Sequence, residues 1–155
     1  MDAVHPRVLG YLGRALSLEL TAVQQYMTQA ALVSVWGDQD SAQWFREESV
    51  SEMRHAEAIV HRLIALGSAP AASQLLPAAH APDLVGLLRA DLVLEDQLLN
   101  LYAEAVRFCL LIGDGEQEGF FRQLWREEQQ HGEVLAAWLG RLQHPHGALH
   151  ERAMF

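Results

Sequence analysis

Apolar residues recur along the chain at the three-to-four-residue spacing of amphipathic helices, in four long stretches. The stretches cover about residues 7–36, 41–66, 82–112 and 116–142. In the first, Leu12, Tyr26 and Val33 share a face with Glu19, because residues seven apart are almost aligned on a helix. Few strand signals stand between the stretches, so the pattern predicts an all-α protein.

The loop lengths predict how the helices are connected. Only a few residues around Gly37 separate the first two stretches, and only a few around Gly113 separate the last two, so both pairs are antiparallel neighbours. The segment GSAPAASQLLPAAHAP joins the second stretch to the third and is too long for a tight turn. We therefore predict an antiparallel four-helix bundle with one long crossover. Gly67 should follow the second helix, and Pro82 should lie in the first turn of the third.

The chain of 155 residues, half of them apolar, suits one domain with a sizeable core. We expect the bundle at about residues 7–142 and a tail at 143–155. Pro145 and Gly147 break the fourth stretch, which leaves a short C-terminal tail or a short fifth helix.

Two Glu-x-x-His motifs lie on faces that otherwise read as core, one in the second stretch and one in the fourth. A further glutamate precedes the glutamate of each motif by 33 residues. Together these residues are Glu19, Glu52, His55, Glu95, Glu128 and His131. Side chains three apart project from one helix face, so both residues of a motif can reach one metal ion. The two helix pairs therefore read as halves of a pseudo-symmetric bundle.

Four carboxylates in a core need compensating cations, because an unpaired buried carboxylate costs several kcal/mol. Two divalent ions balance them, and this ligand pattern is that of di-iron carboxylate bundles. Ligation rich in oxygen with one imidazole per metal favours iron or manganese over structural zinc. A lone Glu-x-x-His is common on solvated helices, but two with matched partners are not. We expect Glu52 and Glu128 to bridge two irons, and Glu19 and Glu95 to bind one each.

Two tyrosines and one methionine accompany these residues. Tyr26 and Tyr102 follow Glu19 and Glu95 by seven residues, so they either donate hydrogen bonds to the ligands or simply fill the core. Met53 directly follows the second-stretch glutamate and must point to a flank, because a helix turns about 100° per residue.

The first stretch also carries an apolar flank that the bundle does not need. Leu20, Val23 and Met27 lie off the inner face and require another partner. We expect at least a two-fold dimer made through the first two helices. Met53 then either packs that interface or meets its own copy across it.

Charge and composition exclude several classes of protein. The net charge of −9 argues against nucleic acid as a partner. No uncharged apolar run approaches the roughly 20 residues of a membrane span, and the start MDAVHPRVLG lacks the features of a secretory signal. Cys109 is the single cysteine, so no internal disulfide can form. These features indicate a cytoplasmic protein.

The stretches LELTAVQQY, ESVSEMRHAEAIVHRLIALG, LLRADLVLE and REEQQHGEVLAAWL are similar to the helix motifs of bacterioferritins, and the resemblance covers about residues 5–142. It implies a ferritin-like domain that acts as a ferroxidase, oxidising Fe(II) with oxygen or hydrogen peroxide. It also implies storage of ferric mineral in a homo-oligomeric shell of about 24 chains. Haem b held between two chains by one methionine from each is implied as well, and Met53 falls on that position. A ferredoxin-type electron donor is a further implied partner.

The sequence departs from that family at several positions. Some members carry a histidine and an aspartate on the inner surface, and this chain has Glu47 and Ser51 at those positions. Tyr102 is unexpected in bacterioferritins, and a tyrosine in each half is more like rubrerythrin, although the Cys-x-x-Cys pairs of a rubredoxin site are missing. Two alternatives therefore stay open: a rubrerythrin-like di-iron peroxidase or oxidase without mineral storage, and a structural or haem-bearing subunit that partners a second ferritin-type chain.

Overall fold

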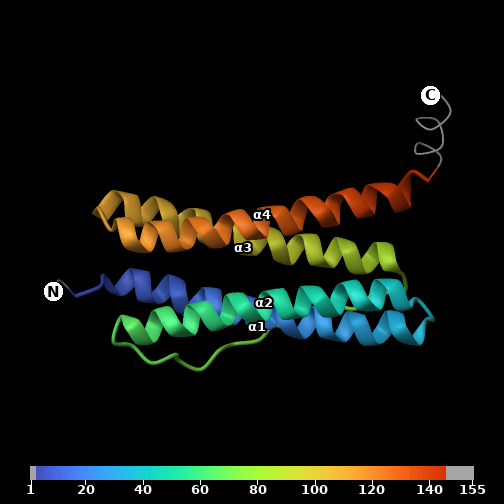
Figure 1. The fold of residues 1–155 in the computed structure, drawn as a ribbon, viewed down its shortest axis with the longest axis horizontal. Helices are drawn as coiled ribbons and strands as arrows, with labels where there is room; N and C mark the ends of the chain where they lie inside the picture. The colour runs from blue at the N-terminus through green and yellow to red at the C-terminus, as the bar shows by residue number, and fades with distance from the viewer. Residues whose placement is uncertain (1–2, 146–155) are drawn as a thin grey trace.

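Four long helices run side by side in the computed structural model, which describes residues 3–145 (Figure 1). They are α1 (Pro6–Val35), α2 (Gln39–Ala65), α3 (Leu84–Ile112) and α4 (Gly115–Gln143). α1 packs along α2, α3 packs along α4, and the pairs meet where α1 contacts α3. The described residues form no strand, and the predicted antiparallel bundle with one long crossover is confirmed.

Local capping groups set where the helices begin and end. α2, α3 and α4 each follow an aspartate whose side chain accepts a hydrogen bond from a backbone N–H three residues on; these are Asp38, Asp83 and Asp114. Pro82 was expected inside the third helix, but it lies two residues before α3 because Asp83 caps that helix. Gly67 follows α2 at a φ of +77°, the left-handed conformation expected of it.

The crossover between α2 and α3 lies along α1 (Figure 1). Three side chains spaced four residues apart on α1 accept hydrogen bonds from its backbone N–H groups. Ser17, Thr21 and Gln25 accept from Gln74, Leu76 and Ala79 at 3.1, 3.2 and 3.2 Å, respectively. Side-chain acceptors thus satisfy backbone donors of a segment that has no helix or strand of its own.

The core consists of two apolar clusters separated by a polar layer. On α1, residues 8–16 belong to one cluster and residues 22–33 to the other, with Glu19 between them. The same interruption occurs on α2 around Glu52, on α3 at Glu95 and on α4 around Glu128. All four helices therefore carry buried glutamates at one level of the bundle.

A buried carboxylate outside this layer joins α3 to α1. Asp91 is fully buried, and its Oδ1 accepts hydrogen bonds from Gln25 Nε2 at 2.8 Å and Gln29 Nε2 at 2.7 Å. Its Oδ2 has no partner. Burial raises the pKa of Asp91 from 3.8 to about 7, although the two glutamine hydrogen bonds act to lower it.

This pKa predicts how Asp91→Asn changes the pH dependence of stability. A raised pKa in the folded state stabilises the fold below about pH 3.8, and this contribution is lost as the pH rises to about 7. Asparagine has no such dependence. Between pH 4 and pH 8, the unfolding free energy of metal-free Asp91→Asn should therefore rise by up to about 4 kcal/mol relative to that of wild type.

Urea unfolding at several pH values measures this shift. Asp96→Asn, on the exposed face of the same helix, is the matched control and should give a curve parallel to wild type. If the unfolding free energy of Asp91→Asn also ran parallel to that of wild type across this pH range, the raised pKa of Asp91 would be contradicted.

The described part of the chain ends shortly after α4. α4 ends at Gln143, and of the tail or fifth helix predicted for residues 143–155, residues 146–155 lie outside the described residues. Within the described part of the chain, no helix combines the length and apolar character that crossing a membrane requires.

Candidate metal centre

The six predicted ligand residues lie together in the polar layer, and they come from all four helices. Their ligand atoms form two groups, and within each group the atoms lie within 4.8 Å of one another. One group is Glu19, Glu52, His55 and Glu128, and the other is Glu52, Glu95, Glu128 and His131. Glu52 and Glu128 belong to both groups, which is the arrangement that two neighbouring metal ions with shared carboxylates require.

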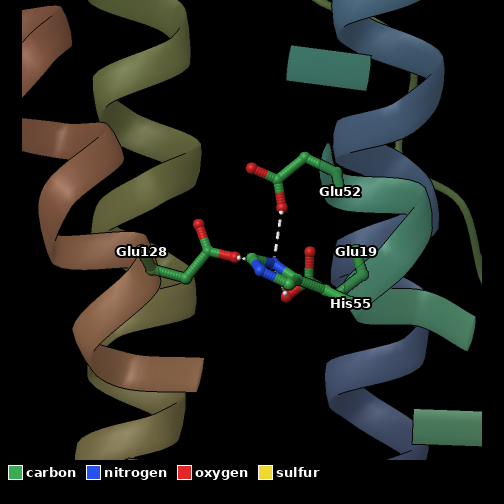
Figure 2. A group of neighbouring side chains, drawn as sticks. All are labelled: Glu19, Glu52, His55 and Glu128. Atoms are coloured by element: carbon green, nitrogen blue, oxygen red, sulfur yellow. Dashed lines mark hydrogen bonds and ion pairs between the residues drawn. The ribbon is translucent and has the colours of Figure 1, made fainter. Parts of the chain in front are cut away.

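Each histidine turns its Nδ1 atom into the centre. His55 Nδ1 lies 2.7 Å from Glu128 Oε1 and 3.1 Å from Glu52 Oε2. Figure 2 shows Glu128 reaching from α4 toward the imidazole of His55 on α2. His131 Nδ1 lies 2.8 Å from Glu52 Oε1, so each imidazole contacts the glutamate of the opposite motif. Because α2 and α4 exchange contacts in this way, the centre couples the two helix pairs.

The glutamates and histidines share protons in this arrangement. Burial raises the pKa of Glu19 well above its usual value, and the charges of Glu52 and Glu128 raise it further. Burial alone would lower the pKa of His131, but hydrogen bonds to Glu128 and Glu52 outweigh it and raise the pKa to about 10. The pKa of His55 rises for the same reasons. Protonated imidazoles thus supply positive charge among the carboxylates, a role that metal cations fill better.

Unpartnered oxygens support a cation at this position. Glu19 Oε2, Glu95 Oε2 and Glu128 Oε2 are buried and accept no hydrogen bond. A buried carboxylate oxygen without a partner is costly, and coordination to a cation removes that cost. The donor set of four carboxylates and two imidazoles fits two iron or manganese ions.

The two tyrosines donate hydrogen bonds across the bundle to the outer glutamates. Tyr26 on α1 donates to Glu95 Oε1 at 2.7 Å, and Tyr102 on α3 donates to Glu19 Oε1 at 2.5 Å. Burial, followed by the nearby carboxylates, raises the pKa of both phenols, so both keep the proton that they donate. The pseudo-symmetry of the sequence thus extends to the groups that orient the ligands.

Met53 lies outside the centre, on the surface of α2. Its side chain is 46% exposed, and that of Val50, three residues before it on α2, is 52% exposed. Of the expected apolar flank on α1 only Met27 is strongly exposed, at 56%. The prediction that Val23 needs an outside partner is wrong: it is buried within the chain, where Ser49 of α2 donates a hydrogen bond to its backbone oxygen. Leu20 likewise packs partly against the core.

Three further residues contact the histidines and were not assigned a role from the sequence. Glu127 Oε2 lies 2.9 Å from His55 Nε2, and Ser51 Oγ lies 3.4 Å from His131 Nε2. Glu48 Oε2 lies 3.4 Å from His131 Nδ1 and has no hydrogen-bond partner. The sequence could have indicated two of them, because Ser51 and Glu127 each directly precede the glutamate of a Glu-x-x-His motif.

The fold and this centre together define a class of protein, the antiparallel four-helix bundle with a carboxylate-rich metal centre between its helices. The family model described as Ferritin-like domain matches residues 9–144. The chain belongs to this ferritin-like family, and within it to the bacterioferritins.

Relatives from several bacteria share much of the sequence. The chain is 35% identical over 129 residues to the bacterioferritin of Rhodobacter capsulatus, covering 83% of this chain and 80% of that protein. It is 32% identical over 134 residues to the bacterioferritin of Mycolicibacterium paratuberculosis, covering 86% and 84%.

A solved structure of Rhodobacter capsulatus bacterioferritin superimposes with a TM-score of 0.86 at 32% identity, covering 90% of this chain and 87% of that one. That structure has a metal-free dinuclear site and a haem iron on a crystallographic special position.

Proposed function

We propose that this protein is a ferroxidase that oxidises Fe(II) to Fe(III) at a di-iron centre within each chain and stores the ferric mineral in a shell. The observation that carries the proposal is the pair of ligand groups that share Glu52 and Glu128. Two Fe(II) ions held side by side can each give one electron to oxygen or hydrogen peroxide.

The residues of the chain have distinct roles in this proposal. Glu52 and Glu128 bridge the two iron positions, and Glu19 and Glu95 each bind one of them. The two histidines supply one nitrogen each through Nδ1. Tyr26 and Tyr102 hold the outer glutamates in place through their hydrogen bonds. Iron enters as substrate, so these ligands must bind it and also release the oxidised product.

The relatives support storage and haem binding. A haem iron on a crystallographic special position, as in the Rhodobacter protein, lies on a symmetry element and is shared between chains. We propose that haem b binds here between two copies of Met53, and that the dimer is the building block of a shell of about 24 chains.

One observation favours the alternative of a rubrerythrin-like peroxidase or oxidase without storage. The hydrogen bond from Tyr102 to Glu19 matches that from Tyr26 to Glu95, so a tyrosine serves each half of the centre. The full ligand set argues against a purely structural subunit, which does not need it.

Aerobic addition of Fe(II) to the purified protein separates these functions. Ferric absorbance should rise faster than in protein-free buffer, and sizing with iron analysis should find the iron in a species of about 24 chains. A dimer that oxidises Fe(II) or reduces peroxide but retains no mineral would reject storage in favour of the alternative.

A further inference from the structure

The two Glu-x-x-His motifs differ in the residue that precedes them. Ser51 precedes Glu52 on α2, whereas Glu127 precedes Glu128 on α4. Each preceding residue contacts the histidine of the opposite motif, at the Nε2 atom that faces away from the centre. The two halves are therefore alike in their ligands and unlike in what stands behind the imidazoles.

The contact behind His55 is the stronger one. Glu127 Oε2 lies 2.9 Å from His55 Nε2, which places a carboxylate at ion-pair distance from the imidazole. Ser51 Oγ lies 3.4 Å from His131 Nε2, which is longer than the usual range, and a hydroxyl carries no charge. The side chain of His131 is also more exposed, at 16% against 9% for His55.

This difference bears on how tightly each imidazole binds a metal ion. A carboxylate that accepts the outer N–H of a metal-binding histidine fixes its tautomer and ring orientation and makes the inner nitrogen a better ligand. The outer nitrogen of His55 has the carboxylate of Glu127 within ion-pair distance for this role, and that of His131 has only the hydroxyl of Ser51. Removing such an outer partner typically weakens metal binding by about 10–100-fold.

We infer that the two metal positions are unequal: the position at His55 fills first and tightly, and Ser51 makes the position at His131 the weaker one. Glu127 and Ser51 are thus positioning residues that set the order in which the centre fills. The inference rests on the proposed di-iron function. Glu48, which also lies near His131, is unchanged in every variant below, so comparisons between them isolate the outer partner.

A calorimetric and visible-absorption titration of the metal-free, full-length protein with Co(II) tests the inference. Wild type should bind two ions per chain in two steps, the second weaker by about tenfold or more. Ser51→Asp should tighten the second step by about 10–100-fold and leave the first unchanged. Ser51→Asn has the same shape without the charge and should give a much smaller gain.

Variants on the other half identify which position fills first. Glu127→Gln should weaken the first step by about 10–100-fold. His131→Ala should keep the first, tight step, and His55→Ala should lose it. The gain in Ser51→Asp cannot arise from damage to the fold, so the test does not depend on variants that lose binding.

The outcomes separate this inference from the proposed function. Two equal steps in wild type, or no tightening in Ser51→Asp, would overturn the inequality and leave the two-metal centre standing. Co(II) binding that is absent, or that persists unchanged in both His55→Ala and His131→Ala, would overturn the centre itself.

Discussion

Glu128→Ala is expected to slow Fe(II) oxidation by about 100-fold or more. Glu128 belongs to both ligand groups, so its loss removes a ligand from both iron positions at once. It also removes the carboxylate that lies 2.7 Å from His55 Nδ1. Losing an outer partner of a ligand already costs about 10–100-fold, and losing a shared ligand should cost at least as much.

Stopped-flow absorbance of the ferric product, with Fe(II) in slight excess over the centres, measures this rate. Glu133→Ala removes an exposed glutamate from the same helix and is the matched control. The control should oxidise Fe(II) at the wild-type rate. If Glu128→Ala oxidises Fe(II) at the wild-type rate, the oxidation occurs elsewhere on the protein.

Met53→Leu is expected to abolish haem binding. The thioether of Met53 is a soft, neutral ligand of the kind that haem iron accepts, and leucine fills similar space with no ligand atom. Met53 is 46% exposed on α2, with the exposed Val50 three residues before it, so the chain leaves it available to a second copy and to a porphyrin. Because each of the two chains would supply one Met53 to the haem, the substitution would remove both methionine ligands at once.

The visible spectrum of protein expressed with ample haem supply provides the measurement. Wild type should show a Soret band, and so should Met27→Leu, which alters another exposed methionine of the described chain. A Soret band that survives unchanged in Met53→Leu would contradict the assignment. Its absence from wild type would remove haem from the account and leave the di-iron proposal intact.

The helices and the six clustered residues could be predicted because both depend on local spacing. Helical periodicity placed Glu19 and Glu95 on inner faces, and the 33-residue repeat paired them with the two motifs. The start of α3 was misplaced because Asp83 caps the helix and Pro82 does not enter it. Cap geometry decides such boundaries, and the periodic pattern does not record it.

Contacts between helices were harder to predict. The burial of Val23 depends on how closely α2 packs on α1, and the hydrogen bond from Ser49 shows that this approach is direct. Asp91 stands four residues before Glu95 on the same face, so its burial had a signal, but its two glutamine partners come from α1. Glu127 also reads as a surface residue until its contact with His55 is known.

Anomalous diffraction at the iron absorption edge, from crystals soaked anaerobically in Fe(II), tests the central claim most directly. Two peaks are expected in each chain, both within coordination distance of Glu52 and Glu128. One peak should lie beside Glu19 and His55, and the other beside Glu95 and His131. Iron peaks confined to the protein surface, or no peak between Glu52 and Glu128, would contradict it.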